Sequence, residues 1–428
     1  MLIGVVLCAL FLLLLLSVHV GISLGVLGFL VEWLYSPFPL HLALGEITWT
    51  ASDSALLMTI PLFVMMGEIL VRSGLAKNMY KGLDRWLSWL PGGLLHANIG
   101  SSTLFSAVCG SSVATAATIT TVAMPQARAL GYGEKLFAGS IAAGGTLGIL
   151  IPPSINLIIY GVLTQTSVPK LFMAGLLPGF LLALMFTIST IVLCLIWPKL
   201  GGPRQYYSWK ERFNSLKHLL PVVILFAAVV ASIYAGWATP TEAASLGVLG
   251  ALIIAISLKA LSLRVMLEVF EGTARTTAMI MLIIVASYFL NFVLASVGFA
   301  DIVSDFLNGL GLGPYSTLFV VIALYFVLGL FVETLSLMVI TIPIVAPIVI
   351  GFGFDPIWFG VLLIVLIEMA LITPPVGLNL FVVQGIRGSG TLNDVVVGAI
   401  PYVAVMFLMV GLLILYPSIA LYLPRVLS

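Results

Sequence analysis

Long apolar runs constrain the fold of this chain more than any other feature. Runs of about 16 to 28 residues recur without the alternating polar positions of a membrane β-barrel. Apolar residues make up 61% of the 428 residues and charged residues only 8%, against about 45–50% and about 25% in an ordinary soluble domain. The sequence therefore predicts an all-α polytopic membrane protein and excludes a water-soluble globule.

The charges and the cysteines exclude further classes. The net charge is +1, so the chain has no basic surface that would bind nucleic acid. Cys8, Cys109 and Cys194 are odd in number and far apart, which indicates neither a disulfide framework nor a zinc site. The run Leu2 to Leu16 resembles the apolar part of a signal peptide. Because no Lys or Arg precedes Arg72, we interpret this run as a true first span.

Continuous spans are expected where an apolar run lies between charged or turn-forming residues. This pattern predicts spans near 2–17, 19–35, 54–71, 171–197, 218–235, 242–258, 275–296 and 397–422.

Four further apolar regions are interrupted. Residues 134–163 and 356–385 contain Pro152-Pro153 and Pro374-Pro375. Proline removes an amide donor and keeps the preceding residue out of the helical conformation, so each region is expected to be two half-helices with unwound backbone between them. The other two regions are about 34 to 36 residues long, and each could be two spans or one re-entrant hairpin. They are 94–127, broken by GSS at 110–112, and 315–350, broken by ETLS at 333–336.

An internal repeat relates these regions. The hexapeptide SLGVLG at 23–28 recurs 222 residues later at 245–250, and the same offset places Pro152 on Pro374. The chain is therefore expected to be one unit duplicated. The predicted division is 1–200 as the first repeat, 201–217 as a cytoplasmic connecting loop and 218–428 as the second repeat.

The basic residues indicate that the repeats are inverted. The segment 72–89 carries four bases, whereas its counterpart at 296–310 carries Asp301 and Asp305 and no base. Under the positive-inside rule these equivalent segments lie on opposite faces of the membrane. With the N-terminus outside and both long broken regions taken as hairpins, 15 of the 17 Lys and Arg residues fall inside. Two full spans in either region would spoil that distribution, so re-entrant hairpins are predicted.

An amphipathic segment precedes each hairpin. Residues 75–90 and, in the second repeat, 300–310 combine an apolar stripe with charged residues, which is typical of a helix lying in the membrane interface. Such arm helices could connect a fixed scaffold to a moving transport unit.

The interrupted regions predict a central binding site. Irregular backbone at membrane depth is tolerated only where it is buried in protein or lines a polar cavity. Broken helices in repeat-related positions are typical of the substrate and ion site of a secondary transporter. Half-helix N-termini attract anions, and free carbonyls at half-helix C-termini can hold a dehydrated cation. The expected cargo is an organic anion carried with Na+.

Two sets of residues are candidates for this site. Carbonyls released by the prolines predict two repeat-related sodium sites. The first comprises Ser106, Cys109, Gly110, Gly148, Ile151 and Pro153, and the second Gly329, Ala370, Thr373 and Val376. The substrate is expected among small, hydroxyl and amide residues, namely Ser111, Ser112, Thr115, Pro152, Ser154, Asn156, Thr334, Ser336, Pro374, Gly377 and Asn379. The alternative is that the small residues merely permit tight helix packing.

Acidic residues in or near the predicted spans include both structural and functional candidates. Glu68 precedes Arg72 by four residues, which favours an i,i+4 ion pair. Glu242 follows Thr239 by three residues, which favours helix capping. Glu333 and Glu368 are candidates for coupling cation to substrate, because an intramembrane acid is a functional candidate by default.

Other functions remain open at this point. GSS at 110–112 could supply the nucleophile of an intramembrane serine protease, although all four histidines lie at predicted span ends or in loops. A channel is a third class, but it does not require paired hairpins. Within the transporters, a sodium/anion symporter could also work without a binding protein.

Three segments resemble one family. CGSSVATAATIT at 109–120, GILIPPSINLIIYG at 148–161 and EMALITPPVGLNLFVVQGI at 368–386 resemble the large, DctM-like membrane subunit of tripartite ATP-independent periplasmic (TRAP) transporters. The resemblance implies an elevator-type Na+ symporter that takes up organic acids across a bacterial inner membrane. It also implies a periplasmic substrate-binding protein and a small four-helix membrane subunit, here expected to be a separate chain, besides membrane lipid. The longest predicted outside loop, Ser36 to Asp53, is too short to form such a binding domain itself.

Overall fold

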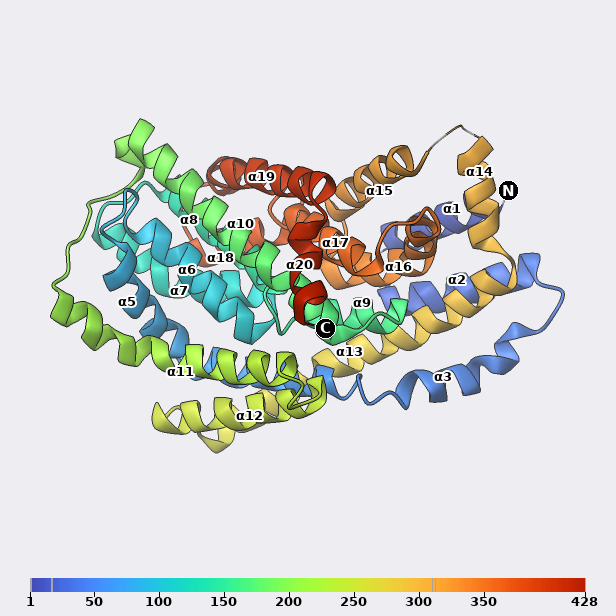
Figure 1. The fold of residues 1–428 in the computed structure, drawn as a ribbon, viewed down its shortest axis with the longest axis horizontal. Helices are drawn as coiled ribbons and strands as arrows, with labels where there is room; N and C mark the ends of the chain where they lie inside the picture. The colour runs from blue at the N-terminus through green and yellow to red at the C-terminus, as the bar shows by residue number, and fades with distance from the viewer. Residues whose placement is uncertain (1, 17, 310, 312, 428) are drawn as a thin grey trace.

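The computed structural model describes residues 2–16, 18–309, 311 and 313–427. Every regular element in these ranges is helical. The molecule is elongated, with α5 to α8 at one end and α14 to α16 at the other, and the C-terminus lies near the middle (Figure 1). The predicted span 2–17 and the predicted arm 300–310 each end one residue outside the described ranges.

The first repeat supplies the elements up to α10. They are α1 (Leu2–Leu15), α2 (Val20–Tyr35), η1 (Leu40–Ala43), α3 (Leu44–Ser52), α4 (Thr59–Arg72), α5 (Leu75–Leu87), α6 (Leu94–Cys109), α7 (Ser112–Ala129), α8 (Glu134–Gly145), η2 (Thr146–Ile149), α9 (Ile155–Thr164) and α10 (Val168–Ile196).

The second repeat follows a short turn of helix, η3 (Pro198–Leu200). Its elements are α11 (Trp209–Tyr234), α12 (Pro240–Ser257), α13 (Leu263–Ser296), α14 (Phe299–Gly309), α15 (Pro314–Gly329), α16 (Thr334–Gly351), α17 (Pro356–Ala370), α18 (Leu378–Arg387), α19 (Leu392–Leu415) and α20 (Ser418–Leu427).

The two repeats interlock. An offset of 222 residues carries α7 onto α16, α9 onto α18 and α8 onto α17 to within a few residues. Helix α7 packs against α18, and α16 packs against α9, so each hairpin contacts the broken helix of the other repeat. Helix α2 contacts α13, and α4 contacts α12, so these helices also pair across the two repeats. Reciprocal contacts of this kind are what a two-fold relation between like units produces.

The hairpin limbs end inside the protein. Helices α6 and α15 have 16 residues each and α7 and α16 have 18, fewer than the ~20 that a membrane-spanning helix needs. Within the described residues, six helices are long and apolar enough to cross a membrane, or seven if the bent pair α4 and α5 is one span. One of the six is α16, which contacts the other limb of its hairpin, α15.

Several predicted boundaries were wrong. Helix α11 begins at Trp209, inside the predicted 201–217 loop, because Ser208 and Glu211 form a capping box there. Helix α13 begins at Leu263 rather than near 275, since charged residues in its first turns remain helical. The predicted span 397–422 is two helices, α19 and α20, separated at Pro417. The expected outside loop at 36–53 contains η1 and α3.

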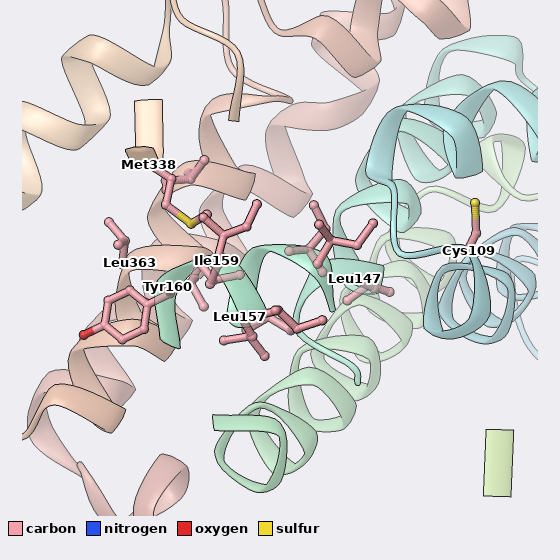
Figure 2. Packing of buried hydrophobic residues seen from close by; sticks show 14 of the residues in the cluster. Cys109, Leu147, Leu157, Ile159, Tyr160, Met338 and Leu363 are labelled. Atoms are coloured by element: carbon pink, nitrogen blue, oxygen red, sulfur yellow. The ribbon is translucent and has the colours of Figure 1, made fainter. Parts of the chain in front are cut away.

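The broken helices are held in place by apolar packing around their outer halves. Leu157, Ile159 and Tyr160 of α9 lie among Met338 of α16 and Leu363 of α17 (Figure 2), and all five are buried. Such close packing fixes the positions of the unwound segments that precede α9 and α18.

Candidate functional site

The two hairpin tips meet in one small cavity. Its volume is about 100 Å³, and it lies among the hairpins, the broken helices and α13. The lining residues come from segments far apart in the sequence: Gly110, Ser111, Ser112, Val113, Ile149, Ile155, Asn156, Thr276, Ile280, Glu333, Thr334, Leu335 and Leu371. Four predicted substrate residues, Ser111, Ser112, Asn156 and Thr334, are therefore brought together, with the coupling candidate Glu333 beside them.

The first tip is a tight glycine turn. Gly110 has φ +66°, which favours glycine, and its amide donates to the Ser106 carbonyl at 2.8 Å. The Ser111 hydroxyl accepts a hydrogen bond from the Ala114 amide at 3.3 Å and so caps α7. The N-terminus of α7 therefore opens at the cavity, where its dipole favours an anion.

A carboxyl group from the second repeat reaches this tip. Ser112 donates its hydroxyl proton to Oε2 of Glu368 at 2.6 Å. Glu368 is fully buried in α17, and its Oε1 has no hydrogen-bond partner among the described residues. This contact joins residues 256 positions apart, so the coupling candidate Glu368 of the second repeat also contacts the tip of the first hairpin.

The second tip carries its own acid. Glu333 is the N-cap of α16 and accepts from the Ser336 amide and hydroxyl, both at 3.1 Å. Ser336 is not among the residues that line the small cavity; it lines a neighbouring space of about 500 Å³ beside Phe11 and Val20, which Glu333 also lines.

The first predicted cation region is compact. A Cβ on Gly148 would overlap the Ser106 side chain and lie 2.6 Å from the Ser106 Cα, so only glycine allows this approach of η2 to α6. Gly110 lies beside the Pro153 carbonyl, 3.7 Å from the position that a Cβ would take. The prolines of each Pro-Pro pair are joined by a cis peptide bond.

The second predicted cation region brings the repeat-related segments together, with a less close backbone approach. Gly329 packs against Ala370, and the Val376 amide donates to the Leu330 carbonyl at 3.3 Å. The Thr373 hydroxyl donates to the Met369 carbonyl at 2.7 Å, so its lone pairs remain available to a cation.

The remaining candidates take local roles or stay unpaired. Ser154 caps α9 by accepting from the Leu157 amide, and Gly377 precedes α18 with φ +58°. Asn379 donates to the Ala142 carbonyl at 3.2 Å, which ties α18 to α8. The Thr115 hydroxyl is buried in α7 and has no partner within the described part of the chain.

Thr276 was not predicted from the sequence. This residue of α13 lines both the small cavity and a neighbouring cavity of about 390 Å³, which extends from Ser111 and Cys109 to Glu68 and Arg72. A hydroxyl inside an apolar span was the available signal. The predicted ion pair of Glu68 with Arg72 is confirmed, and Glu242 forms the predicted capping box with Thr239.

Two interlocked repeats, with hairpin tips and broken helices around one interior cavity, define a multi-pass membrane protein of the transporter class. The family described as "Tripartite ATP-independent periplasmic transporter, DctM component" matches residues 7–419. The chain belongs to this family and is the large membrane subunit of a TRAP transporter.

Individual relatives match over most of their length. The C4-dicarboxylate TRAP transporter large permease protein DctM of Vibrio cholerae is 32% identical, with 96% of this chain and 95% of that protein covered. The sialic acid TRAP transporter large permease protein SiaM of the same organism is 30% identical, with 87% of each covered. The solved YdaH transporter of Alcanivorax borkumensis shares the fold, with a TM-score of 0.66 at 15% identity, 95% of this chain and 99% of that chain being covered.

Proposed function

We propose that this subunit couples inward movement of Na+ to uptake of an organic acid anion by an elevator mechanism. The substrate class is a carboxylate, such as a dicarboxylate or sugar acid, since relatives are described as permeases for C4-dicarboxylates and sialic acid. The partners are a periplasmic binding protein that delivers the anion and a small four-helix membrane subunit. The subunit lies in a bacterial inner membrane with its N-terminus in the periplasm.

The observation that carries this proposal is the set of hydrogen-bonding groups at the small cavity. Asn156 is buried, and its Nδ2 donor has no partner among the described residues. The Ser111 oxygen accepts from the Ala114 amide, which leaves its proton for an acceptor in the cavity. Donors such as these, at the N-terminus of α7, suit a carboxylate.

The same cavity offers groups suited to a cation. Ser112 gives its proton to Glu368, so its remaining lone pairs can face only a donor or a cation. The unwound segments next to Gly148 and Ala370 supply carbonyls nearby. Anion and cation would then lie within one compact region, which gives a physical basis for coupling their movements.

The boundary between scaffold and hairpins supports the elevator. One cavity of about 390 Å³ lies between α4 and α13 on one side and the first hairpin on the other. Another of about 500 Å³ lies between α1 and α2 and the second hairpin. Loose packing along both boundaries would let the hairpins and broken helices move as a unit against the scaffold.

The test is uptake into liposomes that contain both membrane subunits, with the binding protein added outside. A panel of labelled carboxylates is offered under an inward Na+ gradient without ATP. We expect uptake that requires Na+ and stops when the gradient is dissipated. Uptake that ignores Na+ and requires ATP would overturn the proposal. Uptake at the full rate without the binding protein would favour the simpler sodium/anion symporter.

One substitution addresses the anion site directly. Asn156→Leu removes the unpaired donor at similar volume, and we expect uptake to fall to background with the protein still folded. Thr187→Val is the control, because the Thr187 hydroxyl only donates to the Ala183 carbonyl within α10. Equal uptake by the two variants would remove Asn156 from the site.

A further inference from the structure

Unpaired cations gather along the seam between α5 and the beginning of α11. The seam is defined by Lys81 and Arg85 of α5 and by Arg212, Lys217 and His218 of α11. None of these five residues takes part in an ion pair within the described part of the chain. Helix α5 packs along α11, and the charges of Lys217, Arg85 and Lys81 all act on the His218 ring.

The two helices are fixed against each other. The Trp86 Nε1 donates to the Arg212 carbonyl at 3.2 Å. A Cβ on Gly82 would lie 2.8 Å from the Leu219 side chain, so this side chain packs directly onto the α5 backbone. Packing therefore holds these cations close together, and an anion between them would relieve their mutual repulsion.

The acids of the seam are already engaged. Asp84 accepts hydrogen bonds from Ser88 and, at 2.9 Å, from Tyr207. Glu211 accepts from the Ser208 amide at 2.8 Å and from the Ser208 hydroxyl at 2.7 Å. By contrast, Arg212 has a buried Nε with no acceptor among the described residues. The charge of Arg85 acts on Glu211, but the seam still has more basic than acidic residues, with Lys81, Arg85, Arg212 and Lys217 against Asp84 and Glu211.

Aromatic rings beside the cations indicate what kind of anion fits. The Trp86 ring centre lies 5.9 Å from the Phe213 ring centre and 6.5 Å from the Trp209 ring centre. The Arg212 guanidinium lies 5.0 Å from the Trp209 ring centre. Trp209 and Phe213 are 65% and 60% exposed. Tryptophan at a membrane boundary typically lies at the headgroup level. A ligand that satisfies both the cations and the exposed rings carries an anionic group and an apolar part, as an anionic membrane lipid does.

We propose that this seam binds the phosphate headgroup of an anionic membrane lipid, held by Lys81, Arg85 and Lys217 with its acyl chains against Trp209 and Phe213. The lipid bridges the arm α5 and the scaffold helix α11. The site is separate from the transport cavity and does not depend on the proposed substrate.

The test compares lipid binding by the complete membrane complex in nanodiscs of phosphatidylcholine with and without phosphatidylglycerol. The variant is Lys81→Gln/Arg85→Gln/Lys217→Gln. The matched control, Lys199→Gln/Arg204→Gln/Lys259→Gln, removes three other bases that lie outside the seam. Retained lipid is measured by native mass spectrometry, and the melting temperature is measured in parallel.

We expect wild type and control to retain phosphatidylglycerol preferentially and to melt at a higher temperature when it is present. The seam variant should bind it more weakly by about a factor of five for each base removed. The charge-conserving Lys81→Arg/Arg85→Lys/Lys217→Arg should restore binding, which separates lost charge from misfolding. Equal retention by wild type and the seam variant would overturn the proposal. A melting temperature raised equally by inorganic phosphate would also overturn it. So would the finding that the small subunit, and not lipid, covers the seam.

Discussion

The two repeats attach their arms to their hairpins by different interactions. In the first repeat, the Tyr80 hydroxyl of α5 donates to Asn98 Oδ1 of α6 at 2.7 Å, and Asn98 Nδ2 donates to Ser140 of α8 at 2.9 Å. All three residues are fully buried. The offset of 222 residues replaces them by Ile302, Val320 and Leu362, which have no hydrogen-bonding side chains.

The two arm helices also pack against different neighbours. Helix α5 lies along α6, α7 and α11, whereas α14 contacts α13, α16 and α1. Buried hydrogen bonds require one geometry, whereas apolar contacts tolerate sliding. Among the described residues, the first arm is thus held by buried hydrogen bonds that the second arm lacks at the equivalent positions. Duplication preserved the helices, while the side chains between them diverged.

The hairpin contacts also differ between repeats, and this difference predicts the largest effect. Gly148→Ala places a Cβ against both the side chain and the Cα of Ser106. We expect loss of uptake and a fall in unfolding free energy of about 1–3 kcal/mol, the range for overpacking a close contact. Gly329→Ala meets only the Ala370 side chain closely and should keep part of the uptake. Thermal melting and uptake measured on both variants make the comparison.

Rescue variants sharpen this contrast. Ala370→Gly should restore uptake and stability to the Gly329→Ala variant, because the Ala370 Cα lies 3.9 Å from the added Cβ. Ser106→Gly should not restore them to the Gly148→Ala variant, because the Ser106 Cα lies only 2.6 Å from the added Cβ. If both pairs are rescued equally, the two contacts are equivalent and the asymmetry does not exist.

The buried network of the first arm predicts the next effect. Asn98→Leu leaves the Tyr80 hydroxyl without its acceptor, whereas Ser140 keeps its hydrogen bond to the Phe137 carbonyl. The unsatisfied hydroxyl should lower the unfolding free energy by about 1–3 kcal/mol. Tyr80→Phe/Asn98→Leu/Ser140→Ala removes all three polar groups and should recover most of that loss. Thermal denaturation of the purified subunit measures both, with the apolar exchange Val320→Leu as the second-repeat control. A triple variant less stable than Asn98→Leu would contradict this account.

The smallest effect separates the two proposed cation regions. Thr373→Val keeps the shape but deletes a hydroxyl, whereas Cys109→Ala removes a side chain from a region built of carbonyls. We expect Thr373→Val to raise the Na+ concentration for half-maximal uptake about fivefold, the equivalent of one lost ligand of about 1 kcal/mol. Cys109→Ala should change it less than about twofold. An unchanged sodium dependence in Thr373→Val would remove this hydroxyl from the second site.

The sequence by itself determined the repeat, the positions of the breaks and several local contacts. The 222-residue offset places α16 on α7 because a duplicated chain keeps its glycines, prolines and apolar runs in register. Prolines and helix caps are read from neighbouring residues, so the breaks before α9 and α18 and the Glu242 capping box were predictable. The Ser208 capping box could have been found by the same reasoning.

Only the tertiary structure decided which distant groups meet. Hydrophobic periodicity reports which face of a helix is buried but not which partner covers it. Glu368 was a candidate because it is an acid within a span, yet its partner Ser112 belongs to the other repeat. The Tyr80, Asn98 and Ser140 network depends on the packing of three helices, and Thr276 reaches the cavity only through the placement of α13. These contacts follow from how the repeats interlock, and no local pattern in the sequence encodes that arrangement.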